Sequence, residues 1–281
     1  MTLGSNSFPF VATLLIFCLF IRLIRMPEGE MRRAGCSLEG RLISLPTCNT
    51  HYTLLEPDSP KLPQSTPGSL VVIVHGYSGD VSHTIALGRE LRRAGYRVLL
   101  YDLVGRGYSS CRNYDHTASL FVSQLCELLL ALELNEQRLH LVGISLGGGV
   151  CAEYAKYFPK NVASMTLIAS VGLPLCSSVH ILTKLPLLPD FLFRFAPQHT
   201  LVAGLEHEWA DSQNLKYDLM LESYMARVQS EPAFARSMLS TARHFPLEGL
   251  ENTFRRVGRM FDKSVRLWRP PSCVPRCGFD R

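Results

Sequence analysis

The chain has 281 residues, of which 47% are hydrophobic and 19% are charged. This composition excludes a disordered or collagen-like protein, which would lack the apolar side chains needed for a core. The formal net charge of +5 comes from 29 Lys and Arg against 24 Asp and Glu, an excess too small to indicate nucleic-acid binding. Residues 251–281 alone hold eight basic and three acidic side chains, so the chain before them is electrically neutral.

The nine cysteines follow no repeating interval, and their odd number favours a reducing compartment over a disulfide scaffold. Cys273 and Cys277 form a C-x3-C pair, but no second pair or nearby histidine completes a set of four zinc ligands. The sequence therefore implies no metal and no cofactor.

The amino-terminal segment is strongly apolar: residues 1–21 carry no charge, and 8–21 are nearly all hydrophobic. This pattern predicts a short membrane anchor over 1–25, in contact with the bilayer through residues 8–24. Four arginines follow the segment and none precedes it (Arg22, Arg25, Arg32 and Arg33). The positive-inside rule then predicts a single-pass membrane protein whose body is cytoplasmic. A cleaved signal peptide and a buried helix are the alternative interpretations.

After residue 40 the chain alternates between short apolar runs and longer helical patterns. Two short runs within 41–56 predict strands, and the four prolines of 57–68 predict an extended linker. Continuous β-branched runs predict four buried strands, at 69–75, 97–102, 138–144 and 162–169. Helical periodicity predicts three helices, at 83–94, 118–134 and 147–158. This alternation indicates an α/β fold with a mostly parallel sheet flanked by helices, whose core we place at 40–172.

The alternation of strands and helices ends near Gly172. Amphipathic helical stretches punctuated by prolines follow, and we assign residues 173–245 to an inserted helical cap. Residues 246–281 are interpreted as an incomplete return to the core that carries a divergent basic tail.

The sequence Gly143-Ile144-Ser145-Leu146-Gly147 is a G-x-S-x-G motif. It ends a predicted buried strand and opens a predicted helix, which is the setting of a nucleophile elbow. A side chain at either glycine would collide with the neighbouring strand and helix. We therefore interpret Ser145 as a catalytic nucleophile held at the carboxyl edge of the sheet. The alternative is a glycine-rich turn that only packs closely.

A second glycine-containing loop, His75-Gly76-Tyr77-Ser78-Gly79, follows the first buried strand. An oxyanion hole needs two backbone N–H groups aimed at one point. The amides of Tyr77 and Leu146 are the two that we predict for this role. The side chain of His75 is interpreted as structural, hydrogen bonded to its own loop.

Three segments together resemble the α/β-hydrolase fold family, in the capped branch that includes monoacylglycerol lipases, related esterases and carbon–carbon bond hydrolases. They are HGYSGD at 75–80, YDLVGRGYS at 101–109 and LVGISLGGGVCAEYAKYFP at 141–159. The resemblance covers roughly residues 40–265. It implies Ser145 as nucleophile and the amides of Tyr77 and Leu146 as oxyanion hole. Asp102 matches a family loop that is usually structural.

The triad acid and histidine that the family places after the nucleophile are not found. The acid position, just after a strand that starts with residues 264–268, holds Ser272, and the last histidine of the chain is His244. His83 and His116 are the substitutes that an unusual geometry would use. The sheet is therefore expected to lack its final strands, leaving 162–169 as an open edge. A frameshift, an alternative exon or a truncated gene model would each produce such an ending.

Three functions follow from this pattern. The leading one is a membrane-anchored serine hydrolase of carboxylic esters, with a small-molecule ester or lipid as substrate. A carbon–carbon bond hydrolase shares the same motifs. A catalytically incomplete, hydrolase-like protein that binds only ligands or partners is favoured by the missing acid and base.

Overall fold

The computed structural model describes residues 40–57, 70–111, 113–135, 138–173, 232–261 and 265–268. These residues contain a seven-stranded sheet in the order β1-β2-β4-β3-β5-β6-β7. The strands are β1 (Arg41–Ser44), β2 (Asn49–Leu55), β3 (Leu70–Val74), β4 (Arg97–Tyr101), β5 (Leu139–Ile144), β6 (Val162–Ile168) and β7 (Val265–Trp268). Strands β1 and β2 pair antiparallel to their neighbours, and the strands from β4 to β7 are mutually parallel. The predicted α/β fold with a mostly parallel sheet is confirmed.

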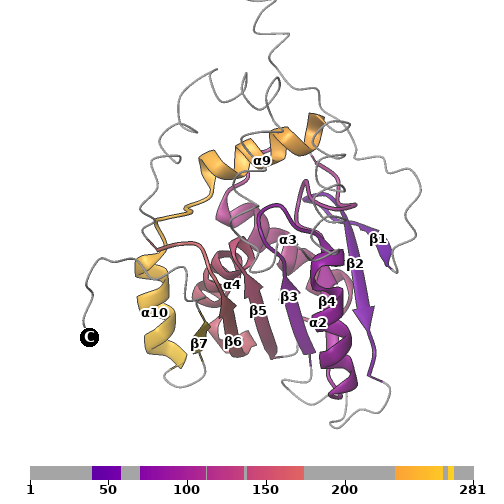
Figure 1. Cartoon of the computed structure of the whole chain (residues 1–281), viewed down its shortest axis with the longest axis vertical. Helices are drawn as coiled ribbons and strands as arrows, with labels where there is room; N and C mark the ends of the chain where they lie inside the picture. The colour runs from indigo at the N-terminus through magenta and orange to yellow at the C-terminus, as the bar shows by residue number, and fades with distance from the viewer. Residues whose placement is uncertain are drawn as a thin grey trace, which may run out of the picture.

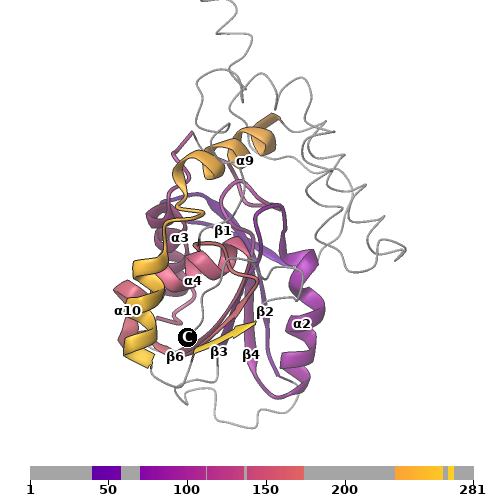
Figure 2. The ribbon, with the colours of Figure 1, turned by 60° about the vertical axis from the view of Figure 1, so that its left-hand side comes forward.

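Helices cover both faces of this sheet (Figure 2). Helix α2 (Val81–Arg93) lies on one face, and α3 (Ala118–Ala131), α4 (Leu146–Tyr157) and α10 (Glu251–Phe261) lie on the other. The alternation of side chains along a strand explains both contacts, because successive residues point to opposite faces. In β3, Val71 and Ile73 pack in the smaller cluster with Val81 of α2, whereas Val72 and Val74 enter the larger one.

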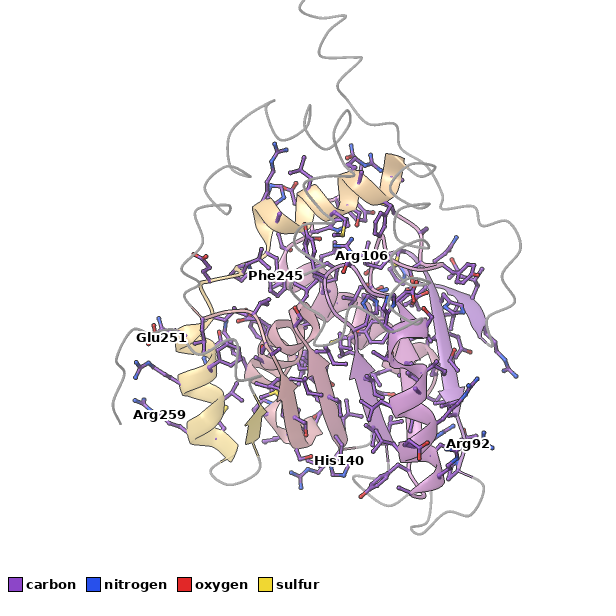
Figure 3. All side chains as sticks on the ribbon, viewed as in Figure 1. Arg92, Arg106, His140, Phe245, Glu251 and Arg259 are labelled. Atoms are coloured by element: carbon purple, nitrogen blue, oxygen red, sulfur yellow. The ribbon has the colours of Figure 1, made fainter. Side chains whose placement is uncertain are left out.

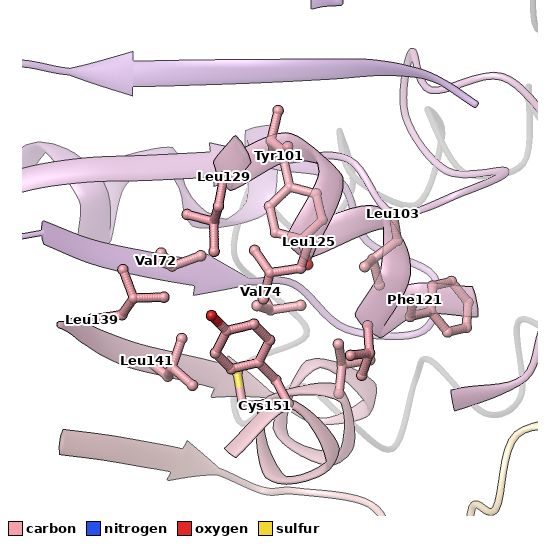
Figure 4. Close-up of a cluster of buried hydrophobic side chains, with 14 of the residues drawn as sticks. Val72, Val74, Tyr101, Leu103, Phe121, Leu125, Leu129, Leu139, Leu141 and Cys151 are labelled. Carbon is pink, nitrogen blue, oxygen red and sulfur yellow. The ribbon is translucent and has the colours of Figure 1, made fainter. Parts of the chain in front are cut away.

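The larger cluster is the main core of the protein (Figure 4). Leu139 and Leu141 of β5 face Leu125 of α3 and Cys151 of α4 there. All four side chains are at most 1% exposed. Burial of this kind contributes about 25 cal/mol per Å² of apolar surface, so it fixes α4 and the turn that precedes it against the sheet.

Helix α9 (Pro232–His244) lies beyond the end of the sheet, across the loops that follow the strands (Figure 1). Its backbone accepts a hydrogen bond from Tyr77 in the loop after β3, through the carbonyl oxygen of Met238. This helix belongs to the segment predicted to form a cap. Residues 174–231 of that segment lie outside the described residues.

The last described strand changes one expectation from the sequence. Strand β7 pairs in parallel with β6, in a register that joins Met165 to Val265 and Ile168 to Trp268. The expectation that residues 162–169 form an open edge of the sheet is therefore wrong. Four consecutive residues, of which Val265, Leu267 and Trp268 are apolar, are enough to continue the sheet by one strand.

The predicted localisation is also corrected. Among the stretches of chain that the structure describes, no helix combines the length and the apolar character needed to cross a membrane. The prediction of a single-pass membrane protein with a cytoplasmic body is not upheld by this finding. Residues 1–25, from which that prediction came, lie outside the described residues.

Candidate active site

Ser145 lies in the turn between β5 and α4, as the G-x-S-x-G motif predicts. Its backbone has φ 52° and ψ −113°, in a region that residues other than glycine rarely adopt. Such a conformation costs about 1–3 kcal/mol and persists only where the surroundings impose it. Here the Ser145 amide donates to the carbonyl of Ile168, and the Ser145 carbonyl accepts from Gly148 and Val171. These bonds fix the turn between two neighbouring strands.

The glycines of the motif are required by close backbone contact. A Cβ at Gly143 would lie 2.5 Å from the Cα of Gly148. A Cβ at Gly147 would lie 2.1 Å from the carbonyl oxygen of Val74 in β3. The collision with strand and helix predicted from the sequence is confirmed. It explains why α4 can begin directly against the middle of the sheet.

The loop after β3 lies beside Ser145. A Cβ added to Gly76 would stand 3.4 Å from the Ser145 Cβ and 4.0 Å from its hydroxyl oxygen. The loop therefore approaches the serine without a side chain between them. Among the residues described, the amides of Tyr77 and Leu146 have no hydrogen-bond acceptor. Two N–H groups that have no acceptor among the described residues thus lie on the two loops that meet at Ser145.

Arg106 holds the Tyr77 loop in place from the loop after β4. Its side chain is fully buried between α9 and the sheet (Figure 3). Nε donates to the Tyr77 carbonyl at 2.6 Å, and the guanidinium lies 5.3 Å from the centre of the Tyr77 ring. The other nitrogens donate to the hydroxyls of Ser237 and Thr241 on α9, the latter at 3.0 Å. One side chain thus connects both loops to the helix above them.

His75 has the structural role predicted for it. Its Nε2 accepts from the Leu103 amide at 3.0 Å, so its Nδ1 carries the proton and donates to the Gly76 carbonyl at 2.8 Å. Burial lowers the pKa of His75 from 6.5 to about 4, although the nearby Asp102 carboxylate opposes this shift. The imidazole is therefore neutral at physiological pH, with both nitrogens engaged.

Asp102 is also structural. Its carboxylate accepts from the amides of Val81 and Tyr108 at 2.7 and 2.8 Å and pairs with His51 at 2.8 Å. The side chain is 1% exposed and joins the start of α2 to β2 and to the loop after β4. This agrees with the structural role that the resemblance implied.

Neither substitute base from the sequence is hydrogen bonded to Ser145. The Nδ1 of His83 lies 3.0 Å from Asp80, in the cap of α2. The Nδ1 of His116 lies 3.2 Å from the Thr241 hydroxyl. Among the described residues, no histidine or carboxylate forms a hydrogen bond with the Ser145 hydroxyl. His180, His199 and His207 lie outside the described residues.

Comparison with known proteins agrees with this geometry. Residues 69–202 match the model of the family described as "alpha/beta hydrolase fold". A probable hydrolytic enzyme from Pseudomonas aeruginosa has a similar structure, with a TM-score of 0.66 and 16% identity over 87% of this chain and 91% of that one. The chain therefore has the α/β-hydrolase fold, and residues 69–202 are similar to that family.

The curated relatives of this chain include lipases. Lipase 1 of Psychrobacter immobilis is 33% identical over 106 residues, which are 37% of this chain and 32% of the relative. Monoacylglycerol lipase ABHD6 of Rattus norvegicus is 26% identical over 121 residues, 43% of this chain and 36% of the relative. The chain spans about a third of the length of the curated relatives that it matches.

Sequence reasoning missed the role of Arg106 in this chain. The residue lies within the segment YDLVGRGYS, between Gly105 and Gly107. The sequence does contain one local indication of this role. It is a charged side chain between two glycines, in a loop that follows a buried strand. Its hydroxyl partners on α9 are more than 130 positions away, so no local pattern predicts them.

The depressed pKa of His75 predicts a loss of stability at acid pH. The unfolded chain takes up a proton on this ring near pH 6.5, whereas the folded chain does so only at about pH 4. Stability is therefore complete above pH 6.5 and falls as the pH drops through this interval, by about 3 kcal/mol at most for this residue. We expect His75→Gln, which retains an acceptor for Leu103, to show a shallower decline between pH 6.5 and 4. Urea unfolding as a function of pH measures both slopes, and identical slopes would contradict the prediction.

Proposed function

We propose that the chain is a serine hydrolase of carboxylic esters, with Ser145 as nucleophile. The Ser145 hydroxyl attacks the ester carbonyl, and the amides of Tyr77 and Leu146 stabilise the negative charge on the carbonyl oxygen. The alcohol leaves, and water then hydrolyses the acyl-serine. The observation that carries the proposal is the approach of the Gly76 loop to Ser145, with two amides that have no acceptor among the described residues.

The substrate class rests on the relatives. Two of them are called lipase and monoacylglycerol lipase, which favours an ester with an acyl chain over the carbon–carbon bond that related hydrolases cleave. We expect the acyl chain to bind beneath the cap that the sequence predicts at 173–245. Helix α9 belongs to this segment and lies over the loops at Ser145.

A second candidate function is a hydrolase-like protein that binds an acyl ligand without cleaving it. It is favoured by the absence, among the described residues, of a histidine that is hydrogen bonded to the Ser145 hydroxyl. A serine without a base keeps its proton and is a weak nucleophile, although oxyanion stabilisation alone leaves residual catalysis.

Covalent labelling separates the two functions. We expect a fluorophosphonate probe to label the full chain at Ser145, and p-nitrophenyl esters to be hydrolysed. Both signals should be lost in Ser145→Ala, a change that removes only one oxygen and leaves the turn in place. Peptide mass spectrometry identifies the labelled residue.

The outcome that overturns the proposal is an unlabelled wild-type chain that still binds a fatty acid, since this supports the second candidate. If labelling occurs, replacing His180, His199 and His207 one at a time with Ala identifies the base. Replacing Ser123, an exposed hydroxyl residue of α3 that is not at the site, with Ala is the matched control and should leave labelling unchanged.

A further inference from the structure

A groove lies between α9 and the loop that precedes α3, and none of the three proposed site residues lines it. Its volume is about 200 Å³, several times the roughly 30 Å³ that one water molecule occupies in the liquid. Asn113, Tyr114 and Asp115 form one wall of the groove, and the other wall is a stripe along α9.

The floor of this groove is held by hydrogen bonds. The amide of His116 donates to the Ser240 hydroxyl at 3.0 Å, and that hydroxyl is 3.2 Å from the Tyr114 carbonyl. His116 and Thr241, both buried, are joined at 3.2 Å. The loop is therefore fixed on α9, and the shape of the groove does not depend on a bound molecule.

The stripe along α9 is cationic. Arg236, Arg243 and His244 line the groove, at positions that share one side of the helix. The partners of Arg236 among the described residues are uncharged: the Asn113 side-chain oxygen at 3.4 Å and the Cys111 sulfur at 3.7 Å. Its positive charge is thus not neutralised within the groove.

Among the described residues that line the groove, Asp115 is the acidic one. Asp115 lies 3.6 Å from the Nε2 of His244, and 73% of its side chain is exposed to solvent, which weakens its field. The buried ring of His116 lies beside this stripe. Its pKa is lowered to about 3, chiefly by burial and further by the positive charges of Arg106 and Arg236.

We propose that this groove binds a phosphoryl group. Guanidinium groups hold phosphate oxygens through paired, charge-assisted hydrogen bonds, and Arg236 and Arg243 both present such a group. The side-chain NH2 group of Asn113 adds an uncharged donor. A carboxylate offers two oxygens in one plane, whereas a phosphoryl group offers three that point in different directions. A phosphoryl group can therefore contact two arginines that are spread over two turns of the helix.

Direct binding to the full chain tests this proposal with inorganic phosphate as the probe. Titration calorimetry in the Ser145→Ala background makes the result independent of any hydrolase activity. We expect saturable binding of phosphate at constant ionic strength. In Arg236→Gln the dissociation constant should rise about tenfold or more, because a charge-assisted contact is lost.

Two variants serve as controls. Asp115→Asn removes the negative side chain found among the described residues of the groove, at an exposed position, and we expect it to bind phosphate more tightly than the parent chain. Arg255→Gln removes an arginine from α10, away from the groove, and should bind as the parent does. No saturable binding by the parent, equal binding by Arg236→Gln, or weaker binding by Asp115→Asn would each overturn the proposal.

Phosphate esters distinguish the source of the phosphoryl group. Glycerol 3-phosphate and dihexanoyl phosphatidic acid are titrated beside inorganic phosphate. Tighter binding of phosphatidic acid supports a lipid headgroup, and equal binding of the three supports a free phosphate. Failure of the groove to bind any of them leaves labelling of Ser145 unaffected, so the two proposals fail separately.

Discussion

Replacing Arg106 with methionine is expected to lower the free energy of unfolding by about 3–5 kcal/mol. The side chain is fully buried, and its nitrogens donate to the Tyr77 carbonyl and to the hydroxyls of Ser237 and Thr241. Methionine fills much of the same volume but donates no hydrogen bond. The acceptors would stay buried without their donor, and each costs about 1–3 kcal/mol in that state. Removing a buried charge offsets part of this loss.

Equilibrium unfolding in urea measures the effect. Arg255→Met is the matched control, since the Arg255 side chain is 65% exposed and pairs only with Glu251 of its own helix among the described partners. Its loss should change stability by no more than about 0.5 kcal/mol. Equal stability of the two variants would show that the buried guanidinium does not hold α9 to the loops.

Replacing Gly147 with alanine should prevent folding or remove at least about 4–5 kcal/mol of stability. The added Cβ would lie 2.1 Å from the Val74 carbonyl oxygen and 2.7 Å from that of His75. Both atoms belong to the backbone at the end of the central strand β3, so no side-chain rotation relieves the contact. The whole of α4 would have to move away from the sheet, and the side chains of Val150 and Cys151 would then lose their buried contacts.

Gly258→Ala makes the same chemical change in α10, and we expect it to raise the stability of the protein. In α10 nothing lies within 4 Å of a Cβ at this position. Alanine in the interior of a helix is about 0.5–1 kcal/mol more favourable than glycine, so this variant should be more stable than the parent. Circular dichroism and the yield of folded protein compare the two substitutions. A Gly147→Ala chain as stable as the parent would refute the contact described for α4.

The sequence predicted most of the fold because its signals are local. The apolar runs at 69–75 and 162–169 become β3 and β6 with ends shifted by one residue at most. All of β3 is buried, as a continuous apolar run predicts, whereas four residues of β6 are only half-buried. The turn at Ser145 was also predictable, because its two glycines are the residues that a tight strand-to-helix connection requires.

The parts of the site that were not predicted depend on contacts between distant segments. Arg106 meets Ser237 and Thr241 only in the folded chain, and nothing in the pattern of residues 232–244 marks two hydroxyls as partners of a buried cation. The pairing of β7 with β6 was missed for a different reason. Pro270 and Pro271 prevent the strand from continuing, but the four residues of β7 come before them and pair with residues 165–168 of β6.

The position of β7 also bears on the order in which the sheet forms. Leu139 of β5 pairs with Val162, whereas Met165 of β6 pairs with Val265, a residue 100 positions away. Closing the longer loop costs about 1 kcal/mol more in chain entropy, and contacts between distant residues slow folding. Strands β3 to β6 can therefore associate while β7 is still undocked. During that interval β6 exposes unpaired amides and carbonyls, and its pairing with another chain competes with the arrival of β7.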